Sequence, residues 1–89
     1  MTWKVEFEPD AQRELDKLDK SIRQRILKFL HERLGKLDDP RQLGERLHGT
    51  LSEFWRYRVG DYRIVCSIEH ERLLVIVLRI GHRRDIYNR

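Results

Sequence analysis

Apolar and charged side chains alternate at the start of the chain. Trp3, Val5 and Phe7 are apolar, and each is separated from the next by a charged residue. Because successive side chains of a strand point to opposite faces, this period of two predicts a half-buried strand over residues 3–7. Pro9 follows, and its fixed backbone and missing N–H suit the first turn of a helix better than a continuing strand.

The pattern then changes to helical spacing, with apolar residues three or four positions apart. The apolar positions are Ala11, Leu15 and Leu18, followed by Ile22, Ile26, Phe29, Leu30, Leu34 and Leu37. Asp19 or Ser21 could cap the second helix, and Pro40, which follows two aspartates, would stop it. These two stripes predict a helical hairpin that packs against a sheet.

Three further strands are predicted in the second half of the chain. Residues 40–50 show no period and are expected to be irregular, whereas residues 54–59, 62–68 and 73–80 are apolar or alternating. Short turns separate these runs, which predicts an antiparallel meander whose last strand ends at Gly81. We therefore expect all 89 residues (1–89) to form one α+β domain, ordered β-α-α-β-β-β, with the helices on one face of the sheet.

Alternation within these strands predicts where the basic residues point. Tyr57 and its apolar neighbours would face the helices, which leaves Arg56 and Arg58 on the other face, together with Arg63 of the next strand. In the last strand the side chains expected to face the helices are Leu74, Ile76, Leu78 and Ile80. A single arginine on the wet face of a sheet is ordinary, but three that converge predict an anion-binding surface.

The end of the chain could complete this surface. After Gly81 come His82, Arg83 and Tyr87, which would reach the arginines if the segment folds over the rim of the sheet. A frayed, solubilising tail is the alternative.

The net charge is concentrated in the same half of the chain. Residues 1–45 carry ten basic and ten acidic residues, whereas residues 46–89 carry nine Arg, no Lys and five acidic residues, which gives the net charge of +4. Arg presents a planar fork that grips phosphate oxygens in pairs, so this bias favours a phosphate-bearing partner.

Several other classes of site have no support in the sequence. The four histidines lack metal-ligand spacing, and the single cysteine, Cys66, lies in an apolar strand as a small core residue would. No signal peptide is evident, and the longest apolar run is too short to span a bilayer. We therefore expect a cytoplasmic protein that uses no metal and no cofactor and does not associate with membranes.

Arg, His and Tyr side chains suit metal-free cleavage of RNA. RNA carries its own nucleophile, the 2′-OH, so the protein must bend the strand, stabilise charge on the phosphate and move two protons. Arg stabilises charge but hardly sheds a proton, which leaves the proton transfer to His82 or Tyr87. DNA lacks the 2′-OH and would not be cut by this route.

Two stretches, LHGTLSEFWRYRVGDYRIVC and VLRIGHRRDIYNR, closely resemble the RelE toxins of bacterial toxin–antitoxin pairs, within the RelE/ParE superfamily. WRYRVGDYRIV and GHRRDIY are the specific parts, and the predicted order of elements also fits. The resemblance implies a small ribonuclease that enters the A site of the 30S ribosomal subunit and cuts messenger RNA (mRNA) there. It also implies a RelB-like cognate antitoxin that blocks the toxin and joins it on operator DNA.

The resemblance implies roles for individual residues. Arg56 and Arg58 match two basic positions that contact the scissile phosphate, and Arg63 matches the arginine that stabilises the transition state. Arg83 matches a second arginine that contacts phosphate. Tyr87 matches the C-terminal tyrosine that orients the base or assists proton transfer.

His82 occupies a position that is basic in relatives, and some members use a nearby histidine as acid or base. RelE proteins can carry Lys where this chain has Arg56 and Arg58, which shifts the proton-transfer role toward His82 or Tyr87. ParE toxins share the fold and poison DNA gyrase without cutting RNA, so a gyrase inhibitor is the alternative function. A non-catalytic basic module that binds nucleic acid is a third.

Overall fold

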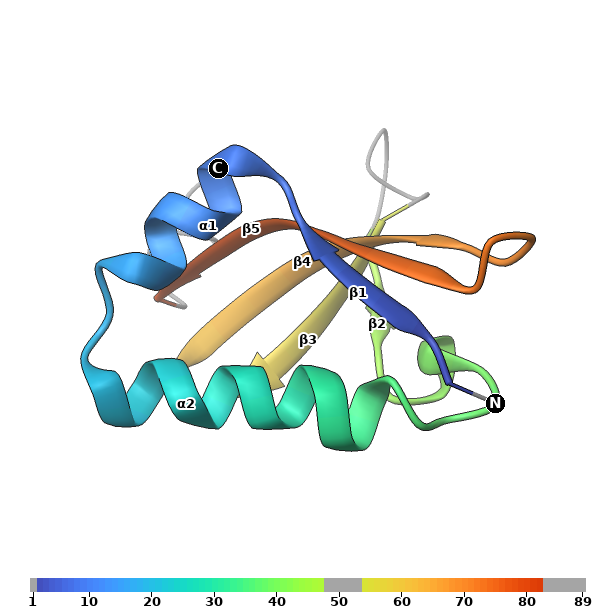
Figure 1. The fold of residues 1–89 in the computed structure, drawn as a ribbon, viewed down its shortest axis with the longest axis horizontal. Coiled ribbons are helices and arrows are strands. Elements are labelled where there is room, and N and C mark those ends of the chain that lie inside the picture. Colours follow the sequence, from blue (N-terminus) through green and yellow to red (C-terminus); the bar gives the residue numbers. More distant parts are fainter. Residues whose placement is uncertain (1, 48–53, 83–89) are drawn as a thin grey trace.

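The part of the chain that the structure describes, residues 2–47 and 54–82, forms a five-stranded sheet with two helices packed on it (Figure 1). The structure is a computed structural model, and its strands lie in the order β1-β5-β4-β3-β2. In chain order the elements are β1 (Lys4–Phe7), α1 (Pro9–Asp16), α2 (Lys20–Lys28), a π-helical turn (Phe29–Leu34), a 3₁₀ turn (Pro40–Gln42), β2 (Glu45–Arg46), β3 (Trp55–Val59), β4 (Tyr62–Glu69) and β5 (Leu74–His82). The predicted α+β class is confirmed.

The core lies between the helices and one face of the sheet. Both helices contribute buried residues to the same cluster as the three long strands, so they cover the same face, as predicted. The buried members of this cluster are Trp3, Ala11, Leu15, Ile26, Leu30, Leu34, Tyr57, Val59, Ile64, Cys66, Val75, Val77 and Ile80.

The sheet is mixed: the predicted antiparallel meander is confirmed, and β1, for which no partner strand was predicted, adds a parallel pair. β3, β4 and β5 do form an antiparallel meander, but β1 pairs in parallel with β5, with Val5 opposite Val75 and Phe7 opposite Val77. Parallel neighbours need a long crossover connection, and the helices that follow β1 begin that connection. β1 therefore forms one edge of the sheet beside the last strand.

The opposite edge is a strand that the hydrophobic pattern did not predict. β2 consists of Glu45 and Arg46, in the stretch expected to be irregular, and it pairs antiparallel with Arg56 and Trp55 of β3. Both β2 residues are exposed, so no apolar alternation marks the strand in the sequence. Its existence depends on a partner strand that comes later in the chain.

The second helix ends before the proline that was expected to stop it. α2 passes into the π-helical turn, in which the N–H of Gly35 donates to the carbonyl of Leu30 at 2.9 Å. The carbonyl of Gly35 accepts the N–H of Trp3 at 2.7 Å, which fastens the helix end beside β1. A Cβ on Gly35 would lie 3.3 Å from the Trp3 carbonyl oxygen, so this close approach favours glycine. Asp19 takes the predicted N-cap position, although its side chain makes no capping hydrogen bond within the described residues.

A bulge in β5 changes which of its residues face the core. Val65 of β4 pairs with Arg79, but the next residue, Cys66, pairs with Val77, which makes Leu78 the extra residue in β5. An extra residue of this kind reverses the alternation of side chains between the two faces.

The prediction for the first half of β5 was therefore wrong by one residue. Val75 and Val77 face the core, and Leu74 and Ile76 point to the other face of the sheet. Beyond the bulge, the predicted core position of Ile80 is confirmed. The pattern could not reveal the bulge because every residue from 73 to 78 is apolar.

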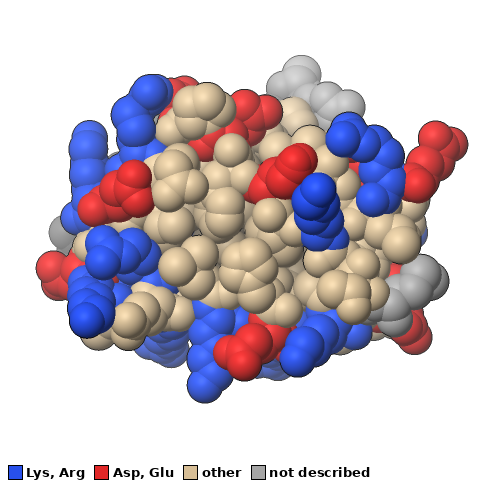
Figure 2. Space-filling model, in the orientation of Figure 1, with Lys and Arg blue, Asp and Glu red and all other residues tan. Residues whose placement is uncertain are grey.

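Helix α1 lies beside the part of β5 that extends past β1. The carboxylate of Glu14 accepts the backbone N–H of Ile80 at 3.0 Å and the guanidinium Nε–H of Arg79 at 3.2 Å. The helix thus supplies an acceptor to a backbone donor at the sheet edge. The face of the molecule seen in Figure 1 carries Lys and Arg interspersed with Asp and Glu around a broad uncharged area (Figure 2).

Candidate functional site

Arg56 and Arg58 of β3 and Arg63 of β4 lie on the face of the sheet that points away from the helices, and we call these three residues the arginine cluster. Tyr57 and Val59 are buried in the core, so alternation along β3 puts Arg56 and Arg58 on the opposite face. Arg58 and Arg63 are paired directly across the two strands. Three of the predicted site residues are thus brought together.

The three arginines differ in exposure. The side chain of Arg58 is 57% exposed and that of Arg56 is 16% exposed, whereas Arg63 is only 6% exposed. A buried guanidinium is costly unless it is hydrogen-bonded, so Arg63 needs partners that stay in place. An anion that approaches from solvent would meet Arg58 first.

The guanidinium of Arg63 is held by the turn between β3 and β4. Its Nη1 donates to the backbone carbonyls of Gly60 and Tyr62, both at 3.1 Å. Gly60 has φ +59, a left-handed conformation that glycine adopts without steric cost. The turn therefore fixes the orientation of the Arg63 guanidinium before any ligand arrives.

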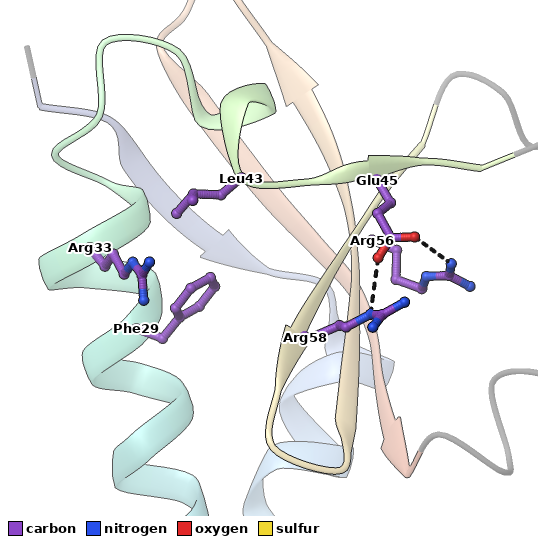
Figure 3. A pocket seen from close by; sticks show the side chains of 6 residues that line it. All are labelled: Phe29, Arg33, Leu43, Glu45, Arg56 and Arg58. Carbon is purple, nitrogen blue, oxygen red and sulfur yellow. Dashed lines mark hydrogen bonds and ion pairs between the residues drawn. The ribbon is translucent and has the colours of Figure 1, made fainter.

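A carboxylate from β2 bridges the other two members of the cluster. Glu45 accepts a hydrogen bond from Arg56 Nη2 at 3.1 Å through Oε2, and its Oε1 lies 2.9 Å from Arg58 Nε (Figure 3). The hydrogen bond from Arg56 lowers the pKa of Glu45 against the opposing effect of desolvation, and the charge of Arg58 adds to the lowering. Glu45 is therefore ionised at neutral pH. Glu45 was not among the predicted site residues, because only the register of β2 on β3 places it opposite Arg56.

A pocket of about 170 Å³ opens beside this bridge. Its walls combine an aromatic ring, an aliphatic side chain, three guanidinium groups and one carboxylate. The lining residues are Phe29, Arg33, Leu43, Glu45, Arg56 and Arg58 (Figure 3). Leu43 is an exposed large hydrophobic residue, so the pocket mouth offers apolar contact next to cationic groups.

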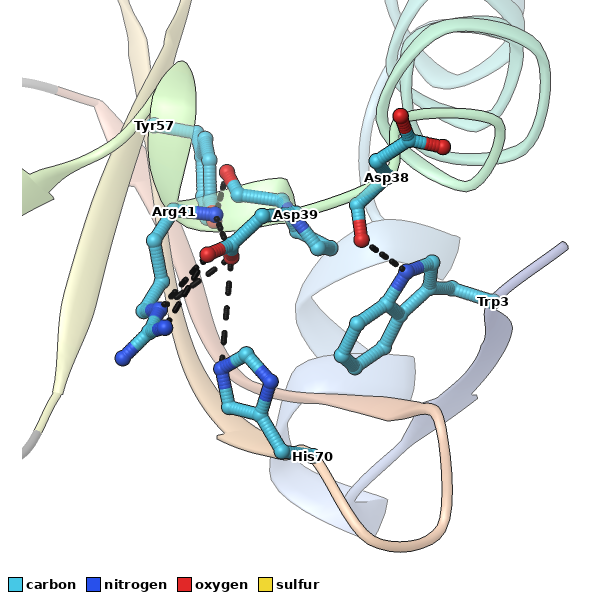
Figure 4. A network of polar contacts seen from close by, with 7 residues as sticks. Trp3, Asp38, Asp39, Arg41, Tyr57 and His70 are labelled. Carbon is cyan, nitrogen blue, oxygen red and sulfur yellow. Dashed lines mark hydrogen bonds and ion pairs between the residues drawn. The ribbon is translucent and has the colours of Figure 1, made fainter. Parts of the chain in front are cut away.

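The buried face of β3 anchors the segment that leads into β2. The hydroxyl of Tyr57 donates to the carbonyl of Pro40 at 2.8 Å, and burial raises the pKa of this hydroxyl, which keeps it protonated (Figure 4). A Cβ on Gly44 would lie 3.0 Å from the Tyr57 ring, so only glycine lets the segment pass this closely. Tyr57 thus fixes the chain immediately before Glu45.

A polar network ties the same segment to the rest of the fold. Asp39 accepts hydrogen bonds from the guanidinium of Arg41, which lower the pKa of Asp39, and its Oδ1 lies 4.0 Å from His70 Nε2 (Figure 4). Trp3 donates from Nε1 to the carbonyl of Asp38 at 3.2 Å, and its ring meets the His70 ring edge to face. These contacts join the start of β1, the 3₁₀ turn and the turn between β4 and β5.

In the part of the chain that the structure describes, His82 does not lie with the arginine cluster. It lies at the end of β5 opposite Tyr62, and the two rings meet edge to face with centroids 5.7 Å apart. Gly81 is the residue paired with Arg63. Neighbours along a strand point to opposite faces, so the His82 side chain lies on the helix side of the sheet.

Two predicted site residues, Arg83 and Tyr87, lie outside the described residues, and their roles stay predictions. Arg79 points to the same face as the arginine cluster by its pairing with Val65, but its guanidinium is bound by Glu14. The Arg79 side chain is therefore held by helix α1 and is not a member of the arginine cluster.

The described residues offer neither a metal site nor a reactive thiol. Within residues 2–47 and 54–82, no group of three or more His, Cys, Asp or Glu side chains could hold a metal ion. Cys66 is fully buried, and burial raises the pKa of its thiol, so it is a packing residue and not a nucleophile. No helix in this part of the chain is long and apolar enough to cross a membrane.

Comparison with known proteins identifies the family. A family model described as the ParE toxin of the type II toxin–antitoxin system parDE matches residues 5–87. The chain is 34% identical over 89 residues to Toxin RelG of Mycobacterium tuberculosis, and the match covers 100% of both proteins.

Two solved structures share the fold. A chain in the toxin–antitoxin complex RelBE2 from Mycobacterium tuberculosis matches with a TM-score of 0.85 and 30% identity, over 93% of each chain. A chain in the archaeal RelE–RelB complex from Pyrococcus horikoshii matches with a TM-score of 0.74 and 28% identity, over 93% of this chain and 97% of the other. This chain therefore belongs to the RelE/ParE superfamily and is a toxin of the type II toxin–antitoxin class.

Proposed function

We propose that this protein is an mRNA endoribonuclease that cuts the message in the ribosomal A site without a metal ion and so inhibits translation. The observation that carries the proposal is the arginine cluster, in which Arg56 and Arg58 already share one anion, the carboxylate of Glu45. A phosphodiester has the same charge and the same capacity to accept paired hydrogen bonds from guanidinium groups. The likeness to RelG supports the assignment.

The proposed reaction uses the 2′-OH of the message as nucleophile. The 2′ oxygen forms a bond to phosphorus, the bond to the 5′ oxygen breaks, and a 2′,3′-cyclic phosphate remains on the upstream fragment. Arg56 and Arg58 hold the scissile phosphate, and Arg63, fixed by its turn, stabilises the extra negative charge in the transition state. Arg83 is proposed as a further phosphate contact.

Two protons must move, one from the 2′-OH and one to the departing 5′ oxygen. The sequence left His82 and Tyr87 as the candidates. The contact of His82 with Tyr62 on the helix side of the sheet favours Tyr87 for the proton donated to the leaving group. Glu45 is a third candidate, as the acceptor of the 2′-OH proton, although its lowered pKa makes it a weak base.

The proposed partners follow from the relatives. Because the RelBE2 and RelE–RelB structures are complexes of toxin with antitoxin, we propose a RelB-like cognate antitoxin for this chain. The arginine cluster would attract an acidic segment of that antitoxin as readily as it attracts RNA. The 30S A site with its mRNA is the proposed target, and operator DNA is the proposed target of the toxin–antitoxin pair, all in the cytoplasm.

The test is a reconstituted translation reaction with purified toxin. mRNA ends are mapped with and without ribosomes, because the proposal requires cleavage only on the ribosome. An intact message at a stoichiometric amount of toxin would reject the nuclease function.

A second candidate function is inhibition of DNA gyrase. The description of the matching family model, a ParE toxin, favours it. Such a protein would inhibit supercoiling of relaxed plasmid by gyrase and would leave mRNA intact. The two assays on one protein preparation separate the candidates.

A further inference from the structure

We propose that Glu45 is a specificity-determining residue of this site, whose carboxylate occupies the place of an RNA phosphate on Arg56 and Arg58 and so weakens the binding of free RNA. This inference rests on the proposed function, because it takes RNA as the ligand of the arginine cluster. It assigns to β2 a role in ligand choice in addition to its place at the sheet edge.

The geometry of the bridge is that of an anion-binding site that the carboxylate of Glu45 already occupies. One carboxylate oxygen of Glu45 lies 3.1 Å from Arg56 and the other lies 2.9 Å from Arg58, so each guanidinium binds one oxygen of the same anion (Figure 3). Two non-bridging oxygens of a phosphodiester would present the same pair of acceptors. A phosphate can bind both guanidinium groups in this way only after the carboxylate of Glu45 has left them.

Glu45 is held at this anion-binding site by the pairing of β2 with β3 and by the segment that precedes it. It is paired with Arg56 in the β2–β3 ladder, which puts the two side chains on the same face. Just before it, Gly44 passes over the ring of Tyr57, whose hydroxyl binds the carbonyl of Pro40. The carboxylate therefore returns to the arginines whenever no other anion competes.

The carboxylate can nevertheless be exchanged for another anion. The side chain of Glu45 is 47% exposed, and that of Arg58 is also exposed, so water can take over their hydrogen bonds as a phosphate enters. Exchange replaces one negative charge with another, and the displaced carboxylate then stays near the phosphate and repels it. RNA that is held only by this site gains little, whereas RNA that a larger particle also holds can bear the loss.

The experiment measures binding without cleavage. A fluorescent single-stranded RNA with 2′-O-methyl groups at every position cannot be cut, and its dissociation constant is measured by anisotropy over a series of salt concentrations. We expect Glu45→Gln to bind roughly three- to tenfold more tightly than wild type at low salt, as the loss of two partly exposed ion pairs would allow. We also expect a salt slope steeper by roughly 0.7 to 1.4, the value for one or two additional phosphate contacts on a single strand.

The matched control is Glu69→Gln. Glu69 lies on the outer face of β4, as its pairing with Leu74 shows, and it forms an ion pair with Arg72 at 2.9 Å, outside the arginine cluster. This variant has the same net charge as Glu45→Gln and should bind RNA about as wild type does. Equal tightening in both variants would show a general charge effect and overturn the inference.

A second variant separates the bridge from the charge alone. Glu45→Asp keeps the charge, but its shorter side chain cannot span both guanidinium groups, so its affinity should lie between those of wild type and Glu45→Gln. Thermal unfolding checks that each variant is folded, and Glu45→Ala replaces Glu45→Gln if that variant is not. Unchanged or weaker binding in the folded neutral variant overturns the inference. Cleavage of mRNA on ribosomes by the wild-type protein tests the proposed function and does not decide this inference.

Discussion

Arg58 of β3 and Arg63 of β4 are cross-strand partners that carry the same charge. Like charges directly opposite each other destabilise a sheet. The structure compensates with neighbouring acceptors: Glu45 lies 2.9 Å from Arg58 Nε, and the carbonyls of Gly60 and Tyr62 bind Arg63. A fold without a ligand for this face would gain nothing from the pair, so the pair itself supports an anion-binding role.

Arg58→Thr is predicted to separate stability from activity. The change removes the like-charge contact and introduces a residue that favours strands, so the free energy of unfolding should stay within about 0.5 kcal/mol of wild type or rise. Cleavage of mRNA should fall at least roughly tenfold because a phosphate contact is lost. Urea unfolding and mRNA end mapping provide the two measurements. Arg72→Thr, at an exposed arginine outside the cluster, should leave cleavage unchanged.

Arg63→Lys is predicted to fold and to lose most activity. Lysine keeps the charge but cannot bind the carbonyls of Gly60 and Tyr62 and still present the planar fork of a guanidinium. Loss of one preorganised stabilising group typically costs about 10²–10³-fold in rate. Single-turnover cleavage on programmed ribosomes measures this loss. Wild-type rates in a folded Arg63→Lys protein would remove Arg63 from the transition-state role.

Arg79→Gln is predicted to lower the stability of the protein and to leave cleavage unchanged. Arg79 shares the outer face with the arginine cluster but pairs with Glu14 of α1, so it serves the docking of the helix. Loss of this charged hydrogen-bonded pair should lower the free energy of unfolding by about 1–2 kcal/mol. Cleavage by the folded protein, measured well below its unfolding temperature, should remain at the wild-type rate. A cleavage defect as large as that of Arg63→Lys would place Arg79 in the site.

Tyr57→Phe is predicted to destabilise the protein by about 1–2 kcal/mol, because the carbonyl of Pro40 loses a buried donor. Tyr62→Phe, at a half-buried position, is the matched control and should change stability by less than about 0.5 kcal/mol. The folded-state pKa of Tyr57 is raised by burial, so its hydroxyl contributes stability below pH 10 that is lost as the pH rises further. Above pH 10 the free energy of unfolding, measured in urea, should therefore fall less steeply with pH for Tyr57→Phe than for wild type.

Local patterns were enough to predict the elements that bury one face. The alternation around Val5 and around Tyr57 and the helical stripe around Ile26 were each confirmed, because burial against a single core imposes these periods directly on the sequence. The same alternation placed Arg56, Arg58 and Arg63 on the outer face correctly. Three members of the site could thus be found without the structure.

The remaining features depend on contacts between distant segments. The parallel pairing of β1 with β5 joins the two ends of the described fold, and no local period encodes it. The bulge at Leu78 lies in a uniformly apolar run, so either face could have been the buried one. Glu45 gains its role only when β2 docks on β3, and two exposed polar residues carry no signal for that event.

The proposed function requires that the arginine cluster cut RNA through the message's own 2′-OH. The most direct test uses two synthetic messages on ribosomes with an empty A site, one all-ribose and one with 2′-deoxy nucleotides throughout the A-site codon. Wild-type toxin should cut the first message within that codon, leave a 2′,3′-cyclic phosphate on the upstream fragment, and not cut the second message at that codon. Cleavage of the deoxy-substituted codon, or no cleavage of either message by folded toxin, would reject attack by the 2′-OH at this site.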